Sequence, residues 1–150
     1  METKERFHKR LVELFHSQKL ASLSTQKDGQ PYASLVAFYH ADDAKHLFFV
    51  TPKTTRKFAN LNADGRVALM INNSTNTDSD FHNAMSVTAV GTANEVLGSE
   101  KQEVLSLYLA KHPYLDEFVN APTCALIEVE VDTYYAVYQF QNVLELHMKP

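Results

Sequence analysis

The feature that most constrains this chain is a series of short apolar segments, most of them separated by polar turns of a few residues. Strands joined by such short connections run antiparallel, because a parallel pair needs a crossover of a dozen residues or more. An antiparallel sheet of many short strands tends to close into a barrel, which removes its unpaired edges. We therefore expect a mainly β fold of the α+β class: an antiparallel barrel of six to seven strands with helices packed outside.

The period of the apolar residues and the turn signals set the expected elements. Helices are predicted at 3–18, 54–63, 98–111 and 114–119. Strands are predicted at 20–25, 31–39, 46–51, 66–72, 84–96, 123–131, 135–140 and 143–147, with a polar loop at 73–80. The Asp28-Gly29 pair is typical of a hairpin turn. Gly91, inside a predicted strand, is expected to mark a bulge or a close approach of the backbone.

Length and composition restrict the classes of partner. A chain of 150 residues is expected to form one domain, 1–150, with one sizeable core. Its net charge of −4, without a basic tract, gives no electrostatic reason to bind nucleic acid. The charged N-terminus and the lack of a long apolar run predict neither a secretory signal nor a membrane span, so we expect a cytoplasmic protein. Cys124 is the only cysteine, and His40 and His46 lack a third ligand, so no metal site is expected.

The segment FFVTPKTTRKFANL carries the most chemical information. A strand ends at Thr51, and a helix is predicted to begin around Thr54 and Thr55, whose hydroxyls suit an N-cap. The free N–H groups of a helix N-terminus attract anions, and Arg56 and Lys57 add two cations at the same place. These residues indicate a phosphate site, although a capped helix with a solvated basic first turn is the alternative.

From about Leu20 to Val96, the order of the segments resembles the pyridoxamine 5'-phosphate oxidase-like family of FMN-binding split β-barrels. The matching segments are LASLST, KDGQP, YASLVAFY, FFVTPKTTRK, RVALMI and AMSVTAVGTANEV. The resemblance implies an antiparallel split β-barrel and FMN as the cofactor. The same phosphate grip suits a related ligand such as a deazaflavin.

The resemblance also implies which residues contact the flavin. In the family, the hydroxyl-Arg-Lys step after the third strand grips the phosphate, and the strand before it lines the flavin. The second strand presents its backbone and a serine to the ring edge. The family also has a glutamine-serine contact to the flavin, for which this chain offers a single serine on the fifth strand. In this chain the phosphate grip falls on Thr55, Arg56 and Lys57, and the strand before it supplies Val50 and Thr51. The second strand supplies Ser34, Leu35 and Val36, and the fifth strand supplies Ser86.

The chain departs from family members that oxidise pyridoxamine phosphate. Those members carry an arginine and a lysine on the second strand, where this chain has the small and apolar residues of YASLVAFY. They also end in a tryptophan-arginine-proline pattern, whereas this chain ends in VLELHMKP and keeps only the terminal Pro150. We therefore expect a flavin protein that is not a true pyridoxamine phosphate oxidase.

The expected function is an FMN-dependent oxidoreductase that acts on a small organic molecule, with a nicotinamide cofactor as the candidate electron donor. No residue is assigned as catalytic. The alternatives are a non-catalytic flavin- or haem-binding or stress protein of the same fold, and a dimeric scaffold without a working site.

The outer positions of several strands also predict a homodimer. YASLVAFY, RVALMI and TYYAVYQF each carry more apolar and aromatic side chains than one barrel interior can bury. A large exposed apolar patch is uncommon on a soluble monomer, and a second copy related by a twofold axis would cover it. The family resemblance implies the same arrangement, with each FMN in the cleft between the protomers.

Overall fold

The computed structural model describes residues 3–149 of the chain. The strands are β1 (Leu20–Lys27), β2 (Gln30–His40), β3 (His46–Pro52), β4 (Arg66–Asn72), β5 (Met85–Glu95), β6 (Cys124–Tyr138) and β7 (Asn142–His147). The helices are α1 (Lys4–Ser17), α2 (Arg56–Ala63), α3 (Asp80–Asn83), α4 (Glu100–Lys111) and α5 (Asp116–Asn120), with a 3-10 turn at Pro113–Leu115. The described strands form one antiparallel sheet in the order β3-β2-β1-β4-β5-β6-β7, and β3 also pairs with β6. The first six strands therefore close into a barrel, and the predicted fold class is confirmed.

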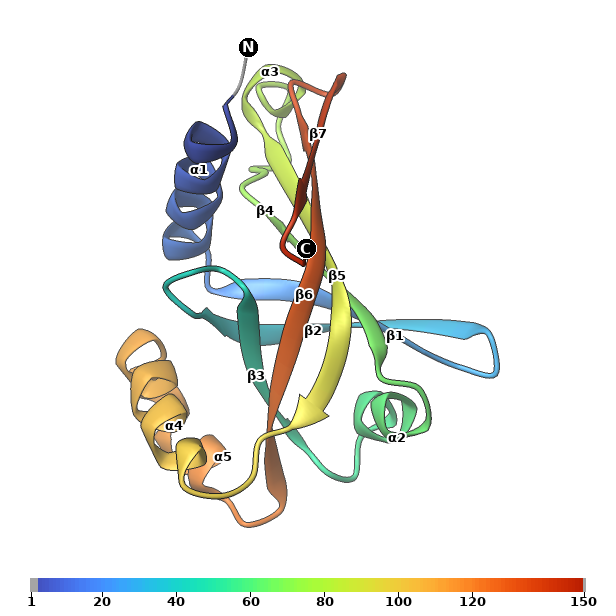
Figure 1. Ribbon diagram of the computed structural model, residues 1–150, viewed down its shortest axis with the longest axis vertical. Coiled ribbons are helices and arrows are strands. Elements are labelled where there is room, and N and C mark those ends of the chain that lie inside the picture. Colours follow the sequence, from blue (N-terminus) through green and yellow to red (C-terminus); the bar gives the residue numbers. More distant parts are fainter. Residues whose placement is uncertain (1–2, 150) are drawn as a thin grey trace.

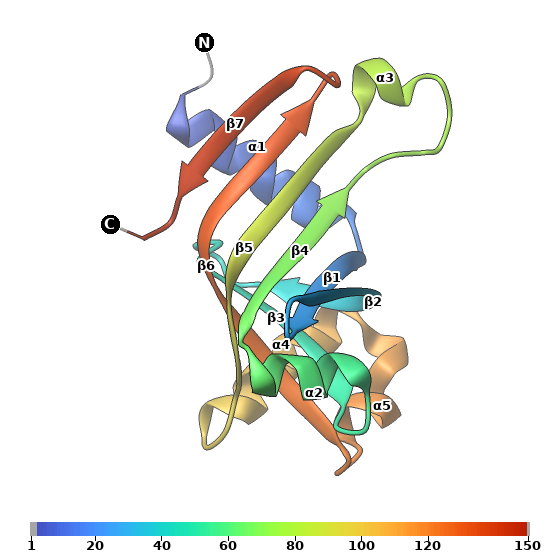
Figure 2. The same cartoon turned by 90° about the vertical axis from the view of Figure 1, so that its right-hand side faces the viewer.

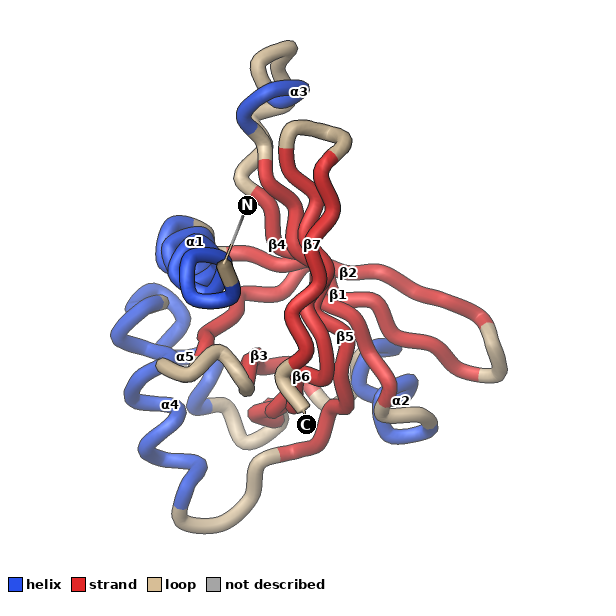
Figure 3. Tube along the Cα trace, turned by 45° about the horizontal axis from the view of Figure 1, so that its top comes forward, coloured by secondary structure: helices blue, strands red, loops and turns tan. Residues whose placement is uncertain are grey.

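The strands β4 to β7 extend from the barrel as a long twisted sheet, with α1 along one side (Figure 1). Figure 2 shows α2, α4 and α5 at the opposite end from α3 and the turn between β6 and β7. The β1–β2 hairpin projects away from the barrel (Figure 3). The molecule thus has two ends, one with α2 and one with α3.

The helix α1 supplies part of the main core. Its apolar residues Phe7, Leu11, Leu14 and Phe15 are buried, as their helical spacing predicts. Thr3 caps the helix, because its Oγ1 accepts a hydrogen bond of 3.1 Å from the backbone N–H of Arg6. These side chains pack against the inward residues of the sheet and fill the space between α1 and the strands.

A second, smaller core lies outside the barrel, beneath α4 and α5. It joins Phe48 and Val50 of β3 to Leu105 and Tyr108 of α4 and to Leu126 of β6. The interior residues of β3 are therefore buried on both faces, which explains why its sequence HLFFVTP has almost no polar alternation.

The predicted strands 123–131 and 135–140 are one continuous strand, β6, so the predicted break is wrong. Val90 of β5 pairs with Thr133 and Gly91 pairs with Val131, which leaves Asp132 as an extra residue in a bulge. The ladder continues past Asp132, although this polar residue resembles a strand end in sequence. The expected close approach at Gly91 is confirmed, because a Cβ there would lie 2.1 Å from the carbonyl oxygen of Glu130.

The turn between β1 and β2 agrees with the prediction, and the turn between β6 and β7 differs from it. Asp28 and Gly29 both have positive φ values, 53° and 79°, as a two-residue hairpin turn requires. Phe140, predicted to end a strand, has a φ of 63° and belongs to the turn between β6 and β7. The helix α3 was not predicted, because its four residues are too few to show a helical period.

His40 is a buried histidine at the end of β2, and it is only 4% exposed. Its Nδ1 has no hydrogen-bond partner in the described chain. Burial, with a smaller contribution from the nearby His16 and Lys111, lowers the pKa of His40 to about 4, and Asp42 acts in the opposite direction. The folded protein therefore holds this imidazole neutral over a pH range in which an unfolded chain protonates it.

Stability should consequently fall as the pH drops from about 6.5 to about 4, because only the unfolded state takes up the proton in this window. The loss assigned to His40 amounts to about 3 kcal/mol at full protonation of the unfolded chain. Urea unfolding of the natural protein and of His40→Gln at pH 7 and pH 4.5 measures it. The variant should lose about 2 to 3 kcal/mol less than the natural protein on acidification; equal losses would show that His40 does not produce the effect.

Candidate functional site

The N-terminus of α2 is built by two threonines. Thr55 is the N-cap: its Oγ1 accepts from the backbone N–H of Phe58 at 3.3 Å and donates to the carbonyl oxygen of Pro52 at 2.9 Å. The hydroxyl of Thr51, a residue that is 1% exposed, lies 3.0 Å from that of Thr55. The two hydroxyls fix the turn that leads from β3 into α2, and the first N–H groups of the helix have no partners within the helix.

The first turn of α2 carries positive charge where the helix dipole is already positive. Arg56 and Lys57 occupy its first two positions, and the turn holds no acidic residue. Cations at a helix N-terminus oppose the dipole unless an anion lies between them. The arrangement is therefore suited to an anionic group such as a phosphate.

The two cations line different hollows along β2. Arg56 is exposed, and its guanidinium carbon lies 5.8 Å from the centre of the Tyr32 ring. It borders a hollow of about 440 Å³ shared with the β1–β2 hairpin. Lys57 is half-buried and borders a second hollow of about 300 Å³. The N-terminus of α2 thus lies beside two stretches of the same strand.

The second hollow gathers several of the predicted flavin contacts. Leu35 and Val36 of β2 and Val50 of β3 border it together with Lys57. Successive side chains of a strand point to opposite faces, so a hollow that touches both Leu35 and Val36 meets the edge of β2. Backbone N–H and C=O groups lie along that edge.

This edge of β2 is open in the described chain. The strand β3 pairs with β2 only at Phe38, Tyr39 and His40, while β1 pairs with the other side of β2 along most of its length. Ser34 lies on the unpaired stretch, and its buried Oγ has no hydrogen-bond partner among the described residues. A buried hydroxyl without a partner is costly, although Ser34 itself borders neither of the two hollows.

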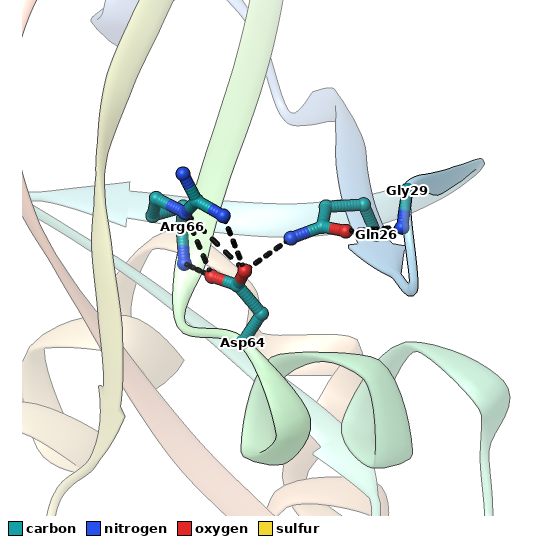
Figure 4. A network of polar contacts seen from close by, with 4 residues as sticks. All are labelled: Gln26, Gly29, Asp64 and Arg66. Atoms are coloured by element: carbon teal, nitrogen blue, oxygen red, sulfur yellow. Dashed lines mark hydrogen bonds and ion pairs between the residues drawn. The ribbon is translucent and has the colours of Figure 1, made fainter.

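A polar network fixes the β1–β2 hairpin against the far end of α2 (Figure 4). The Asp64 carboxylate accepts hydrogen bonds from the Arg66 guanidinium, at 2.6 Å from Nη2, and from the Gln26 side-chain amide. The oxygen of that same Gln26 amide accepts from the backbone N–H of Gly29 at 3.0 Å. The bonds to Arg66 hold the pKa of Asp64 well below its ordinary value. Inside, Asn60 of α2 donates to the Thr25 hydroxyl of β1 at 3.0 Å, so α2 and the hairpin form one support for the site.

Tyr108 of α4 and His112, which follows it, form hydrogen bonds to the backbone of β2. They were not predicted as site residues from the sequence. The Tyr108 hydroxyl donates to the carbonyl oxygen of Ala37 at 2.9 Å, and His112 Nε2 donates to that of Phe38 at 2.7 Å. Tyr108 also borders the hollow of Lys57, and burial raises the pKa of its hydroxyl. A tyrosine on the apolar side of a predicted helix was the only available signal.

Ser86 lies apart from the other predicted contacts. It is on β5 opposite Asn72 and Val137, beside the β4–β5 loop. This is the end of the molecule that carries α3, whereas α2 is at the opposite end (Figure 2). One chain therefore brings together Leu35, Val36, Val50 and Lys57 at one hollow, with Ser34, Thr51, Thr55 and Arg56 on the adjoining strand and turn, and leaves Ser86 separate.

In residues 3–149, no group of three or more His, Cys, Asp or Glu side chains is placed to hold a metal ion. Among the helices of the same range, none has both the length and the apolar character needed to cross a membrane.

The barrel and its partly unpaired second strand define a split β-barrel protein. The chain belongs to the pyridoxamine 5'-phosphate oxidase family, whose model matches residues 7–138. The family predicted from the order of segments is confirmed. A comparison with curated proteins found no match.

Solved structures show the same fold in proteins of low sequence identity. A haem-binding protein from Mycobacterium smegmatis is 16% identical with a TM-score of 0.79, over 91% of this chain and 57% of that one. The haem storage protein from Vibrio cholerae is 16% identical with a TM-score of 0.73, over 91% and 92%. An FAD-binding protein from Mesorhizobium loti is 17% identical with a TM-score of 0.68, over 85% and 89%. This chain thus spans little more than half of the mycobacterial protein, and the split barrel occurs in both flavin and haem proteins.

Proposed function

We propose that this protein is a homodimeric FMN-binding flavoprotein that works as an oxidoreductase on a small organic molecule. The observation that carries the proposal is the N-terminus of α2, where Arg56 and Lys57 meet free helix N–H groups beside the open edge of β2. A phosphate would be held between these two cations, and Arg56 can bind it in a bidentate manner.

The ring of the flavin would lie in the hollow next to Lys57. Leu35, Val36 and Val50 supply apolar contact there, and the open edge of β2 supplies backbone donors and acceptors. The unpartnered hydroxyl of Ser34 fits the polar rim of an isoalloxazine ring. When bound, the flavin supplies the electron transfer, while the protein supplies binding, orientation and exclusion of water.

A second copy of the chain would complete the site. The hollow of about 300 Å³ is at the lower limit for an organic ligand, and it is open on the outer side of β2, where Leu35 is 68% exposed. The outer face next to it is apolar along several strands and suits an isologous contact. In such a dimer Ser86 of one protomer would approach the flavin held by its partner, which accounts for its separation from the other contacts within one chain.

The substrate is proposed to differ from pyridoxamine phosphate. The part of β2 beside the site, YASLVA, carries no cation, and the two cations of α2 that border the hollows are assigned to the flavin phosphate. Lys27 of the hairpin borders only the hollow of Arg56, away from the one proposed for the ring. Pyridoxamine phosphate should therefore be oxidised poorly by the FMN-loaded protein, while reduced nicotinamide should bleach the flavin absorbance. Stopped-flow absorbance with each reductant tests this; rapid oxidation of pyridoxamine phosphate would contradict the assignment.

Haem binding is the second candidate, because two proteins of the same fold bind or store haem. Titration with haem separates the two candidates: a Soret band that saturates at one haem per chain, together with no affinity for FMN, would favour the haem function.

A further inference from the structure

The strands β2 and β3 part at a fork. The strand β3 is paired with β6 along its whole length, and the part of β2 before Phe38 is paired with β1. Between themselves, β2 and β3 pair only from His40 to Phe38, where Phe38 faces Phe49. The next pair in this register would be Ala37 with Val50. The open edge of β2 therefore begins at this fork.

The register determines which backbone groups face each other at the fork. The backbone N–H of Ala41 donates to the carbonyl oxygen of His46 at 2.9 Å, so these two residues form a hydrogen-bonded pair of the same register. Such pairs alternate with non-hydrogen-bonded pairs along an antiparallel ladder. By this alternation Ala37 and Val50 also occupy a hydrogen-bonded position. An uninterrupted ladder would join the N–H of Val50 directly to the carbonyl oxygen of Ala37.

The hydroxyl of Tyr108, from α4, stands at this position. It donates a hydrogen bond of 2.9 Å to the carbonyl oxygen of Ala37. Burial raises the pKa of Tyr108, and a hydrogen bond with the backbone of Val50 lowers it. A backbone group has this effect only as a donor, because an N–H stabilises the phenolate. One hydroxyl thus bonds to the two backbone groups that would otherwise bond to each other.

Packing keeps the Tyr108 side chain at the fork. The residue is 1% exposed and belongs to the second core, together with Phe48 and Val50. His112 follows one turn later, and its ring centre lies 4.9 Å from that of Tyr108. Its Nε2 is 2.7 Å from the carbonyl oxygen of Phe38. A closely packed ring has little room to move, so α4 holds β2 at two successive carbonyl groups.

The fork borders the hollow proposed for the flavin ring. Tyr108 and Val50 line it together with Leu35 from the open edge of β2. We propose that Tyr108 is a positioning residue, whose hydroxyl is inserted in the ladder between Ala37 and Val50 and keeps the edge of β2 open for the flavin. The inference rests on the proposed FMN function for its ligand, whereas the separation of the two strands does not depend on it.

Scalar coupling across hydrogen bonds, measured by NMR on isotope-labelled protein without added FMN, tests the insertion directly. The natural protein should show no coupling between the Val50 nitrogen and the Ala37 carbonyl carbon, because the hydroxyl lies between them. Tyr108→Phe removes that hydroxyl and leaves two buried backbone groups without partners, which is costly. The strands should then close by one pair, and the coupling should appear. Tyr108→Leu, which also shortens the side chain, should show the same coupling.

The effect on the ligand is measured by fluorescence titration with FMN. Tyr108→Phe should weaken FMN binding by about three- to tenfold, because the ligand must first break the new ladder bond. Tyr134→Phe is the matched control. Tyr134 is also fully buried, and its hydroxyl donates to the carbonyl oxygen of Ala44 at 2.7 Å, in the turn between β2 and β3. Urea unfolding should show a similar loss of stability in both variants, while Tyr134→Phe keeps its FMN affinity.

A coupling already present in the natural protein, or missing from both Tyr108 variants, would overturn the inference. So would FMN binding that Tyr108→Phe leaves unchanged, or that Tyr134→Phe weakens equally, because Tyr108 would then only stabilise the fold. Failure of the proposed function has a different signature, in which FMN binds to none of the proteins and the coupling still appears in Tyr108→Phe.

Discussion

Replacing Met70 by lysine should convert the protein from a dimer to a monomer and remove most of its FMN affinity. Met70 is 40% exposed on the outer face of β4. Its neighbours in register are Ser22 of β1 and Thr88 of β5, and the same cross-strand row continues to Leu35 of β2 and Tyr135 of β6. A twofold contact on this row would bury Met70 twice, so one substitution places two charges in an apolar interface.

The expected weakening of the dimer is large. Burying an unpaired ammonium group costs several kcal/mol, so two copies weaken association by about a thousandfold or more. Light scattering should give a mass near the 17.0 kDa of one chain for Met70→Lys and near twice that value for the natural protein. Because a shared site binds flavin only when assembled, FMN should be released with dissociation.

Leu97→Lys is the matched control for this substitution. Leu97 is 70% exposed but lies after the end of β5, outside the cross-strand row, so a lysine there should leave both the mass and the flavin unchanged. A natural protein that is monomeric with FMN bound at full occupancy would refute the shared site.

The substitution Arg56→Ala should lower the affinity for FMN by about ten- to a hundredfold. It removes a charge-assisted, bidentate partner of the phosphate, a type of contact worth about 1.5–3 kcal/mol. The side chain is exposed and stabilises the fold little, so the circular dichroism spectrum should not change. Fluorescence quenching of FMN on titration with the protein measures the dissociation constant.

Lys53→Ala provides the control for charge alone. Lys53 is three residues away, but its ammonium group lies 3.8 Å from the Glu95 carboxylate and so is directed toward β5. Its removal should leave FMN affinity nearly unchanged. Equal effects of the two substitutions would mean that general attraction by positive charge, and not the N-terminus of α2, holds the phosphate.

Local signals made much of the fold and the N-terminus of α2 predictable. The Asp28-Gly29 turn fixes the β1–β2 hairpin through its two positive φ values. Thr55 is the N-cap of α2, one residue from the predicted start of the helix at residue 54. Gly91 could be identified because only a residue without a side chain allows the backbone of Glu130 to approach so closely. Each of these features depends on residues that are close in sequence or on a single residue type.

The features that escaped prediction depend on contacts between distant segments. The continuity of β6 through Asp132 follows from the pairing with β5, some forty residues earlier in the chain. The contact of Tyr108 with Ala37 and the ring of Tyr32 under Arg56 join elements whose relative positions appear only in the folded chain. The unpartnered hydroxyl of Ser34 is visible only once β3 is seen to leave β2 unpaired there.

The most direct test of the central claim is the absorption spectrum of the purified protein, with the mass of the ligand released on denaturation. We expect the two visible bands of an oxidised flavin and a released ligand with the mass of FMN, at one per chain. A Soret band from haem, or a protein that neither carries FMN nor takes it up when FMN is added, would contradict it.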